Sequence, residues 1–189
     1  MSLRKALLGA LWLGACALAQ ASDLAQKLQS PDHVLLMRHT LAPGIGDPAN
    51  YRLSDCQSQR NLSAEGRQQA THTGQWLKQQ GVAQAEVYSS PWCRCKDTAA
   101  LLQFGEVTIA PALASFFDDM RQAPASHRAL QQLIADKLKT KGRKALILVT
   151  HHVNILEFAG ENIDSGDMVL ARVNARGQLL SYQRLARPQ

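Results

Sequence analysis

The chain has 189 residues, of which 46% are hydrophobic, and a formal net charge of +6 at pH 7. This length suits a single domain with its own core, and no internal repeat or low-complexity tract divides the sequence. The mild positive charge permits anionic ligands, but the basic residues are scattered and form no stripe with aromatic residues. We therefore expect no nucleic-acid partner.

Residues 1–21 have the pattern of a secretory signal peptide. Arg4 and Lys5 precede the apolar run ALLGALWLGACALA, and a small-x-small cleavage site ends at Ala21. The run is shorter than the ~20 residues that a membrane-spanning helix needs. We predict cleavage after Ala21, no membrane span, and a periplasmic or otherwise exported domain over residues 22–189. A lipid anchor at Cys16, which lies behind small residues, is the alternative.

The first predicted element of that domain is a buried strand over residues 33–38, which ends abruptly on Arg38 and His39. A long segment rich in Gly, Pro, Asp and Ser follows over residues 40–61. A loop of this length inside a compact domain usually has a function. We expect it to form much of a wall that faces the substrate.

Helical and strand patterns alternate along the rest of the chain. The predicted helices cover residues 62–81, 91–103, 126–142 and the segment after residue 151. The predicted strands cover residues 85–90, 106–111 and 144–150, and a hairpin covers residues 167–185. This alternation predicts a three-layer α/β/α sandwich around a mostly parallel sheet, without a second domain.

Reactive side chains follow three of the predicted strands. Arg38 and His39 close the first strand, Arg94 opens the helix after the second, and His151 and His152 follow the most apolar one. Ligands of open α/β sheets bind beyond the carboxyl ends of the strands, so these residues are expected to meet. Guanidinium groups match a phosphoryl group, and a neutral imidazole is nucleophilic near pH 7. The pattern predicts an oxyanion site and, without a further ligand frame, no metal.

The blocks LLMRHT, LSAEGRQQA, YSSPWCRCKDTA and LVTHH, in this order, resemble the histidine phosphatase superfamily, whose fold is phosphoglycerate mutase-like. The resemblance implies a histidine acid-type phosphatase without a cofactor, in which His39 is the nucleophile that becomes phosphohistidine. It also implies that Arg38, Arg94 and His151 contact the phosphate. With the signal peptide, the chain looks most like the exported branch, which includes lipopolysaccharide core heptose-phosphate phosphatases. The expected substrate is a small-molecule or glycan phosphate monoester.

The sequence departs from the family pattern at three places. Thr40 and His152 stand where the family usually has glycine, which makes both of them candidate phosphate ligands. The family's acid usually follows a leucine after the third strand, whereas Asp118 and Asp119 lie a turn further on. They are the candidate general acids, because burial and a neighbouring carboxylate both raise a carboxyl pKa. A solvated turn is the alternative reading of both aspartates.

Three cysteines remain after the predicted cleavage. Cys93 and Cys95 are two residues apart and do not face each other on a helix, so a disulfide would use Cys56 with one of them. We predict a Cys56–Cys93 disulfide, which would tie the long loop to the phosphate-binding helix. Three free thiols are the alternative.

The favoured reading is an exported phosphomonoesterase that acts through a phosphohistidine. A catalytically inactive protein that binds a phosphate ligand or assists envelope assembly is the main alternative. A phosphomutase is less favoured, because export separates the protein from glycolytic intermediates.

Overall fold

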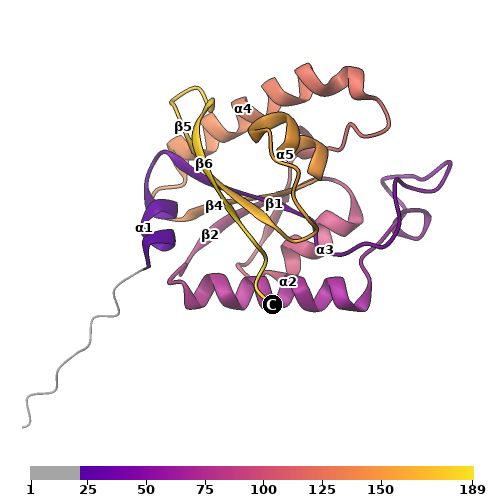
Figure 1. Ribbon diagram of the computed structural model, residues 1–189, viewed down its shortest axis with the longest axis horizontal. Helices are drawn as coiled ribbons and strands as arrows, with labels where there is room; N and C mark the ends of the chain where they lie inside the picture. Colours follow the sequence, from indigo (N-terminus) through magenta and orange to yellow (C-terminus); the bar gives the residue numbers. More distant parts are fainter. Residues whose placement is uncertain (1–21) are drawn as a thin grey trace, which may run out of the picture.

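The computed structural model describes residues 22–189, so the predicted signal peptide and Cys16 lie outside the described residues. Its six strands form one sheet in the order β3-β2-β4-β1-β5-β6 (Figure 1). The first four strands in the chain pair in parallel, and the last two form an antiparallel hairpin that joins the sheet through β1. The strands are β1 (His33–Arg38), β2 (Ala85–Ser89), β3 (Val107–Ile109), β4 (Ala145–Thr150), β5 (Met168–Val173) and β6 (Leu179–Leu185).

Helices cover both faces of this sheet, which makes the predicted three-layer sandwich (Figure 1). The α-helices are α1 (Asp23–Gln29), α2 (Ala64–Gln79), α3 (Cys93–Leu101), α4 (Ala123–Thr140) and α5 (His152–Ala159). Three short 3-10 turns complete the secondary structure: η1 (Cys56–Ser58), η2 (Pro111–Leu113) and η3 (Met120–Gln122). Every helix within residues 22–189 is too short or too polar to span a membrane.

Alternate residues of β1 contribute to two separate cores. Val34 and Leu36 pack with the side chains of α4 and α5, whereas Leu35 and Met37 pack with those of α1, α2 and α3. All four are fully buried. A strand that is covered on both faces is apolar throughout, and this explains the continuous hydrophobic run in the sequence.

Most predicted elements are present with shifted ends. The helix predicted from residue 91 begins at Cys93, because Trp92 is extended and acts as the N-cap. The helix predicted from residue 126 begins at Ala123, since Pro124 fits the first turn of a helix. Helix α1 was not predicted. Ser63 caps α2, and its side chain accepts a hydrogen bond from the backbone of Gly66.

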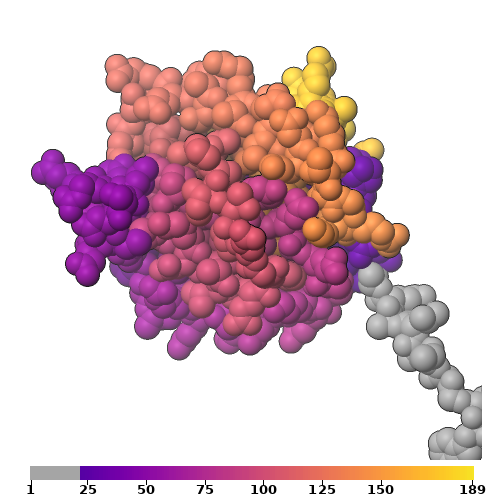
Figure 2. All heavy atoms as spheres, turned by 180° about the vertical axis from the view of Figure 1, so that it is seen from behind, coloured from indigo at the N-terminus to yellow at the C-terminus, as the bar shows by residue number. Residues whose placement is uncertain are grey.

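The carboxyl ends of β1, β2 and β4 meet at one edge of the sheet, because these strands are parallel. The backbone N–H of His39 donates to the Thr150 carbonyl, and that of Ser90 donates to the Val149 carbonyl. The loop over residues 40–61 leaves this edge and projects from the body as a purple lobe (Figure 2). The fold thus places the segments after three strands, and the loop, around one point.

Candidate active site

A cavity of about 280 Å³ lies at this edge of the sheet. We call four of the residues that line it the floor: Arg38, His39, Arg94 and His151. The structure therefore brings together all four residues implied as the phosphate-binding and nucleophilic set. A larger cavity of about 390 Å³, between α1 and residues 141–145, is lined by no histidine or cysteine.

His39 is fixed in one tautomer by its own backbone. Its Nδ1 lies 2.8 Å from the Thr40 carbonyl oxygen, and because a carbonyl only accepts, Nδ1 carries the proton. The lone pair is then on Nε2. Burial, followed by the charges of Arg94 and other arginines, holds the pKa of His39 well below its usual value. The ring is therefore neutral near pH 7, with Nε2 available as a nucleophile.

His151 lies beside His39, with 5.6 Å between the ring centroids. Its Nδ1 is 3.5 Å from Nη2 of Arg94, which can only donate, and its Nε2 is 2.8 Å from the Ser90 hydroxyl. Nε2 therefore carries the proton and donates a hydrogen bond to the Ser90 hydroxyl oxygen. Burial, then the charges of His39 and Arg94, hold the pKa of His151 well below its usual value. Both histidines of the floor are neutral.

Arg94, in the first turn of α3, forms a buried ion pair with Asp47 of the loop. Its Nη1 donates to the two carboxylate oxygens at 2.9 and 3.0 Å, and the side chains of Arg94 and Asp47 are 4% and 5% exposed. Asp47 also accepts hydrogen bonds from Trp92 Nε1 at 3.0 Å and from the backbone N–H of Arg60 at 2.9 Å. The carboxylate thus fixes one side of the guanidinium group and joins the loop to α3.

Two arginines of the floor carry buried donors that have no acceptor. Arg38 donates from Nη1 to the Ile163 carbonyl at 2.7 Å. Within residues 22–189, the Nε atoms of Arg38 and Arg94 are buried and lack a hydrogen-bond partner. An unpaired buried N–H is costly and points to a ligand or an ordered water. An oxyanion in the cavity can supply the missing acceptors.

Arg60 adds a third guanidinium group from the loop side of the cavity. Its Nε donates to the Gly46 carbonyl at 2.7 Å, and its Nη1 donates to the Ala42 carbonyl. Three arginines thus face the cavity against one buried carboxylate, Asp47. Since a phosphate monoester carries a charge of about −2 near pH 7, this surplus of positive charge suits it.

Thr40 and His152, the two candidate phosphate ligands that replace glycines of the family pattern, lie in different places. His152, the first residue of α5, lines the cavity, and burial, then Arg38 and Arg60, lower its pKa. Thr40 does not line the cavity, and its hydroxyl lies 3.1 Å from that of Thr98 in α3. Because the Thr98 hydroxyl donates to the Arg94 carbonyl, the Thr40 hydroxyl donates to Thr98. The expectation that Thr40 contacts phosphate is therefore wrong in this geometry.

The two candidate acids also separate. Asp118 lines the cavity and accepts a hydrogen bond from the Tyr51 hydroxyl at 3.1 Å. Asp119 is not among the lining residues: it caps η3 and forms an ion pair of 2.7 Å with Arg121. The hydrogen bond from Arg121 lowers the pKa of Asp119, which is the opposite of what a general acid needs. The two side chains leave the turn in different directions, so Asp118 faces the cavity and Asp119 faces Arg121.

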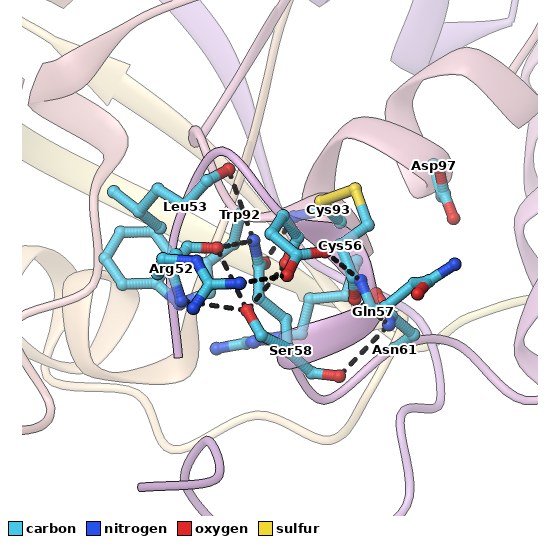
Figure 3. The surroundings of a disulfide bond; sticks show 12 residues. Arg52, Leu53, Cys56, Gln57, Ser58, Asn61, Trp92, Cys93 and Asp97 are labelled. Atoms are coloured by element: carbon cyan, nitrogen blue, oxygen red, sulfur yellow. Dashed lines mark hydrogen bonds and ion pairs between the residues drawn. A yellow bond between two sulfur atoms is a disulfide. The ribbon is translucent and has the colours of Figure 1, made fainter. Parts of the chain in front are cut away.

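A disulfide joins Cys56 in η1 to Cys93, the first residue of α3 (Figure 3). This is the predicted pairing, and it leaves Cys95 as a buried free thiol whose pKa is raised by burial to about 12. Gln59 makes a second connection. Its Oε1 accepts from the Cys93 backbone at 3.0 Å, and its Nε2 donates to the Arg52 carbonyl at 2.9 Å. The end of the loop is therefore fixed to the helix that supplies the buried arginine.

Three polar residues that hold the floor and the start of α3 in place, Asp47, Gln59 and Ser90, were not predicted from the sequence. Asp47 lies between a glycine and a proline, so its surroundings predict only a turn. Gln59 belongs to no motif. Ser90 ends the second predicted strand, and nothing in the sequence marks it as a partner of His151. No group of three or more His, Cys, Asp or Glu side chains in the described part of the chain is placed to hold a metal ion.

Residues 34–122 match a family model described as "Histidine phosphatase superfamily (branch 1)". A comparison with curated protein sequences finds no match. Among solved structures, the protein histidine phosphatase SixA complexed with tungstate is 17% identical, with a TM-score of 0.54 over 82% of this chain and 94% of that one.

Two further solved structures are similar to the same extent. A phosphoserine phosphatase from Entamoeba histolytica in complex with 3-phosphoglyceric acid is 16% identical, with a TM-score of 0.55 over 82% of this chain and 95% of that one. A mycobacterial glucosyl-3-phosphoglycerate phosphatase with inorganic phosphate is 13% identical, with a TM-score of 0.56 over 82% and 96%. At such low identities these likenesses show the fold alone.

Proposed function

We propose that this chain is a phosphomonoesterase that acts through a phosphohistidine on His39. The match to the histidine phosphatase family model and the shared fold support this proposal. The observation that carries the proposal is the His39 ring. It is 1% exposed, neutral, and held by the Thr40 carbonyl so that the Nε2 lone pair is free, in a cavity with three arginines. These are the requirements of a nucleophile that attacks a phosphate.

In the proposed reaction, Nε2 of His39 attacks phosphorus while the bond to the ester oxygen breaks. Arg38 and Arg94 contact the phosphoryl oxygens, and their guanidinium groups stabilise the charge that spreads over them. His151, the third implied contact, would turn its Nε2–H from the Ser90 hydroxyl to a phosphoryl oxygen. The leaving alkoxide takes up a proton, for which Asp118 is the candidate donor in the cavity. Water then attacks the phosphohistidine, releases inorganic phosphate and restores the neutral ring.

The test of the nucleophile uses the His39→Ala variant. We expect it to lose turnover while it retains binding of tungstate or inorganic phosphate. Wild-type protein should form an acid-labile phosphoryl label from substrate, and the variant should form none. Turnover by His39→Ala at an appreciable fraction of the wild-type rate would remove the covalent mechanism.

The test of the acid compares two substrates in the Asp118→Asn variant. An aryl phosphate has a good leaving group and needs little protonation, so its rate should barely change. A sugar phosphate should slow by ~10²–10⁴-fold, which is the usual contribution of a general acid. Asp119→Asn serves as the neighbouring control and should leave both rates unchanged. Equal slowing of both substrates in Asp118→Asn would place the acid elsewhere.

We further propose that the protein is exported and acts on a sugar phosphate or an envelope glycan phosphate, as in the branch of lipopolysaccharide heptose-phosphate phosphatases. The signal-like residues 1–21 support export, and the Cys56–Cys93 disulfide suits an oxidising compartment. N-terminal sequencing of the protein from a periplasmic fraction should give Ser22 as the first residue. A modified Cys16 there would indicate a lipid anchor.

A protein that binds a phosphate ligand without turnover is the second candidate. The observation in its favour is the Asp47–Arg94 ion pair, because a bound phosphate must share Arg94 with a carboxylate that is already in place. The labelling experiment separates the two functions. A binding protein takes up tungstate but forms no phosphoryl label.

A further inference from the structure

The mouth of the cavity differs in chemistry from its floor. The cations are gathered at the floor and at Arg60, whereas the mouth is lined by Ile45, Phe117 and the glycines on either side of Ile45. Ile45 is 91% exposed and Phe117 is 40% exposed. Two large apolar side chains thus stand in solvent beside a phosphate-binding floor. Exposed apolar groups that continue a cavity of this kind mark a ligand-binding surface.

The backbone holds Ile45 in this position. Gly44 and Gly46 have φ angles of +94° and +67°, a region that glycine enters without strain, so the chain turns sharply on both sides of Ile45. A Cβ atom added at Gly46 would lie 3.8 Å from the Phe117 ring. The tip of the loop and Phe117 are therefore neighbours. The Phe117 ring in turn lies 5.7 Å from the His152 ring, so the apolar surface extends toward the floor.

The polar groups at the mouth are partly occupied within the protein. The Ser115 hydroxyl accepts a hydrogen bond from the Phe117 backbone at 3.2 Å, and Asp118 accepts one from Tyr51. Asn162 also lines the cavity. None of Ile45, Phe117, Ser115 and Asn162 is a cation, so a second anionic group on a substrate finds no counter-ion among them.

We propose that the mouth of the cavity is a subsite for the apolar part of an uncharged leaving group. Phosphate monoesters of neutral alcohols with an apolar surface near the ester are then preferred over esters that carry a second anion. This inference rests on the proposed phosphomonoesterase function and narrows its substrate class. The phosphate binds at the floor, and the alcohol lies between Ile45 and Phe117.

Matched alkyl esters test the subsite, because ethyl and hexyl phosphate have leaving groups of similar reactivity. In the wild type, kcat/KM for hexyl phosphate should exceed that for ethyl phosphate by at least about tenfold, since added methylenes in an apolar site are worth this much. A carboxylate at the far end of the hexyl chain should lower kcat/KM by at least about tenfold. Ile45→Ser and Phe117→Ser should each bring the hexyl-to-ethyl ratio toward one.

The matched control is Ile109→Ser, which changes an isoleucine of 43% exposure on β3, away from the cavity, and should keep the wild-type ratio. A wild-type ratio near one, or a ratio unchanged in both Ile45→Ser and Phe117→Ser, would overturn the inference. If no monoester is hydrolysed, the proposed function fails separately. Calorimetric titration of His39→Ala with hexyl and ethyl phosphate then tests the subsite independently of turnover. Hexyl phosphate should bind at least about tenfold more tightly than ethyl phosphate, and equal affinities would overturn the inference.

Discussion

The floor of the cavity and the loop over residues 40–61 are fixed in different ways. The floor residues follow strands of the sheet, and backbone hydrogen bonds such as that from His39 to Thr150 hold them. The loop is held mainly by side chains: the Cys56–Cys93 disulfide, Gln59 and the ion pair of Asp47 with Arg94. The parallel sheet sets the backbone positions of the floor, and the loop adds the contact of Asp47 with the Arg94 side chain. The loop reaches its position only through a few contacts that single substitutions remove.

This difference teaches that changes in the floor should alter chemistry and changes in the loop should alter stability and access. The Asp47–Arg94 pair is the point where the two regions meet, so it offers the sharpest way to separate them. The predictions below run from the largest expected effect to the smallest.

Substitution Asp47→Ala should lower the free energy of unfolding by ~3–5 kcal/mol, because it leaves the buried Arg94 without its counter-ion. Saturating inorganic phosphate should restore more of this stability than it adds to the wild type, since the anion replaces the carboxylate. Urea unfolding with and without phosphate measures both effects. The control is Asp136→Ala, which breaks an exposed pair with Lys139 on α4 and should cost far less than Asp47→Ala. Equal losses in the two variants would contradict a special role for Asp47.

Substitution Arg94→Lys should lower kcat/KM by ~10²–10³-fold, the range found when one donor to a developing negative charge is removed. An ammonium group cannot hold Asp47 on one side and present a planar donor edge on the other. Steady-state kinetics with an aryl phosphate measures the loss. Arg67→Lys, in the exposed pair with Asp97, should keep the wild-type value. A loss below tenfold in Arg94→Lys would argue that the floor does not bind phosphate through this residue.

Reduction of the Cys56–Cys93 disulfide should lower the free energy of unfolding by ~2–4 kcal/mol, because it releases a closure over 37 residues of sequence separation. In the folded protein, KM should rise by a larger factor than kcat falls, because the loop becomes more mobile while the residues of the floor keep their positions. The comparison is best made in Cys95→Ala, which removes the free thiol and should respond to reduction in the same way. A fall in kcat with unchanged KM would show instead that the disulfide supports the floor.

Stability should fall as the pH is lowered from 7.5 toward 5. His39 and His151 have pKa values well below the ordinary 6.5, so below that pH the unfolded chain binds protons that the folded chain does not. Their contribution is fully present above pH 6.5 and is lost at ~1.4 kcal/mol per pH unit for each histidine. Urea unfolding across this range measures the slope. His39→Asn should reduce the slope of the unfolding free energy against pH, whereas His72→Asn, at an exposed position, should leave it unchanged. Equal slopes in the wild type and both variants would contradict the role given to His39.

Much of the fold and of the floor could be predicted from the sequence. A run that is apolar on both faces predicts a central parallel strand, and the polar residues that follow such strands must meet at one edge, because parallel strands end on the same side. The sequence alone therefore predicts that Arg38, His39, Arg94 and His151 lie close together. The use of Cys56 in a disulfide could also be predicted, since helix geometry excludes a Cys93–Cys95 bond. That argument leaves the choice between Cys93 and Cys95 open, and the structure shows that Cys93 is the partner.

The tertiary structure alone decided which side chains of the loops and turns face the cavity. Thr40 turns toward Thr98, Asp118 lines the cavity while its neighbour Asp119 turns toward Arg121, and Asp47 lies against Arg94. A strand alternates its side chains with a fixed period, so its sequence specifies which residues point inward. A loop has no such period, and each side chain takes the direction in which it finds a hydrogen-bond or ion-pair partner, which comes from a distant part of the chain.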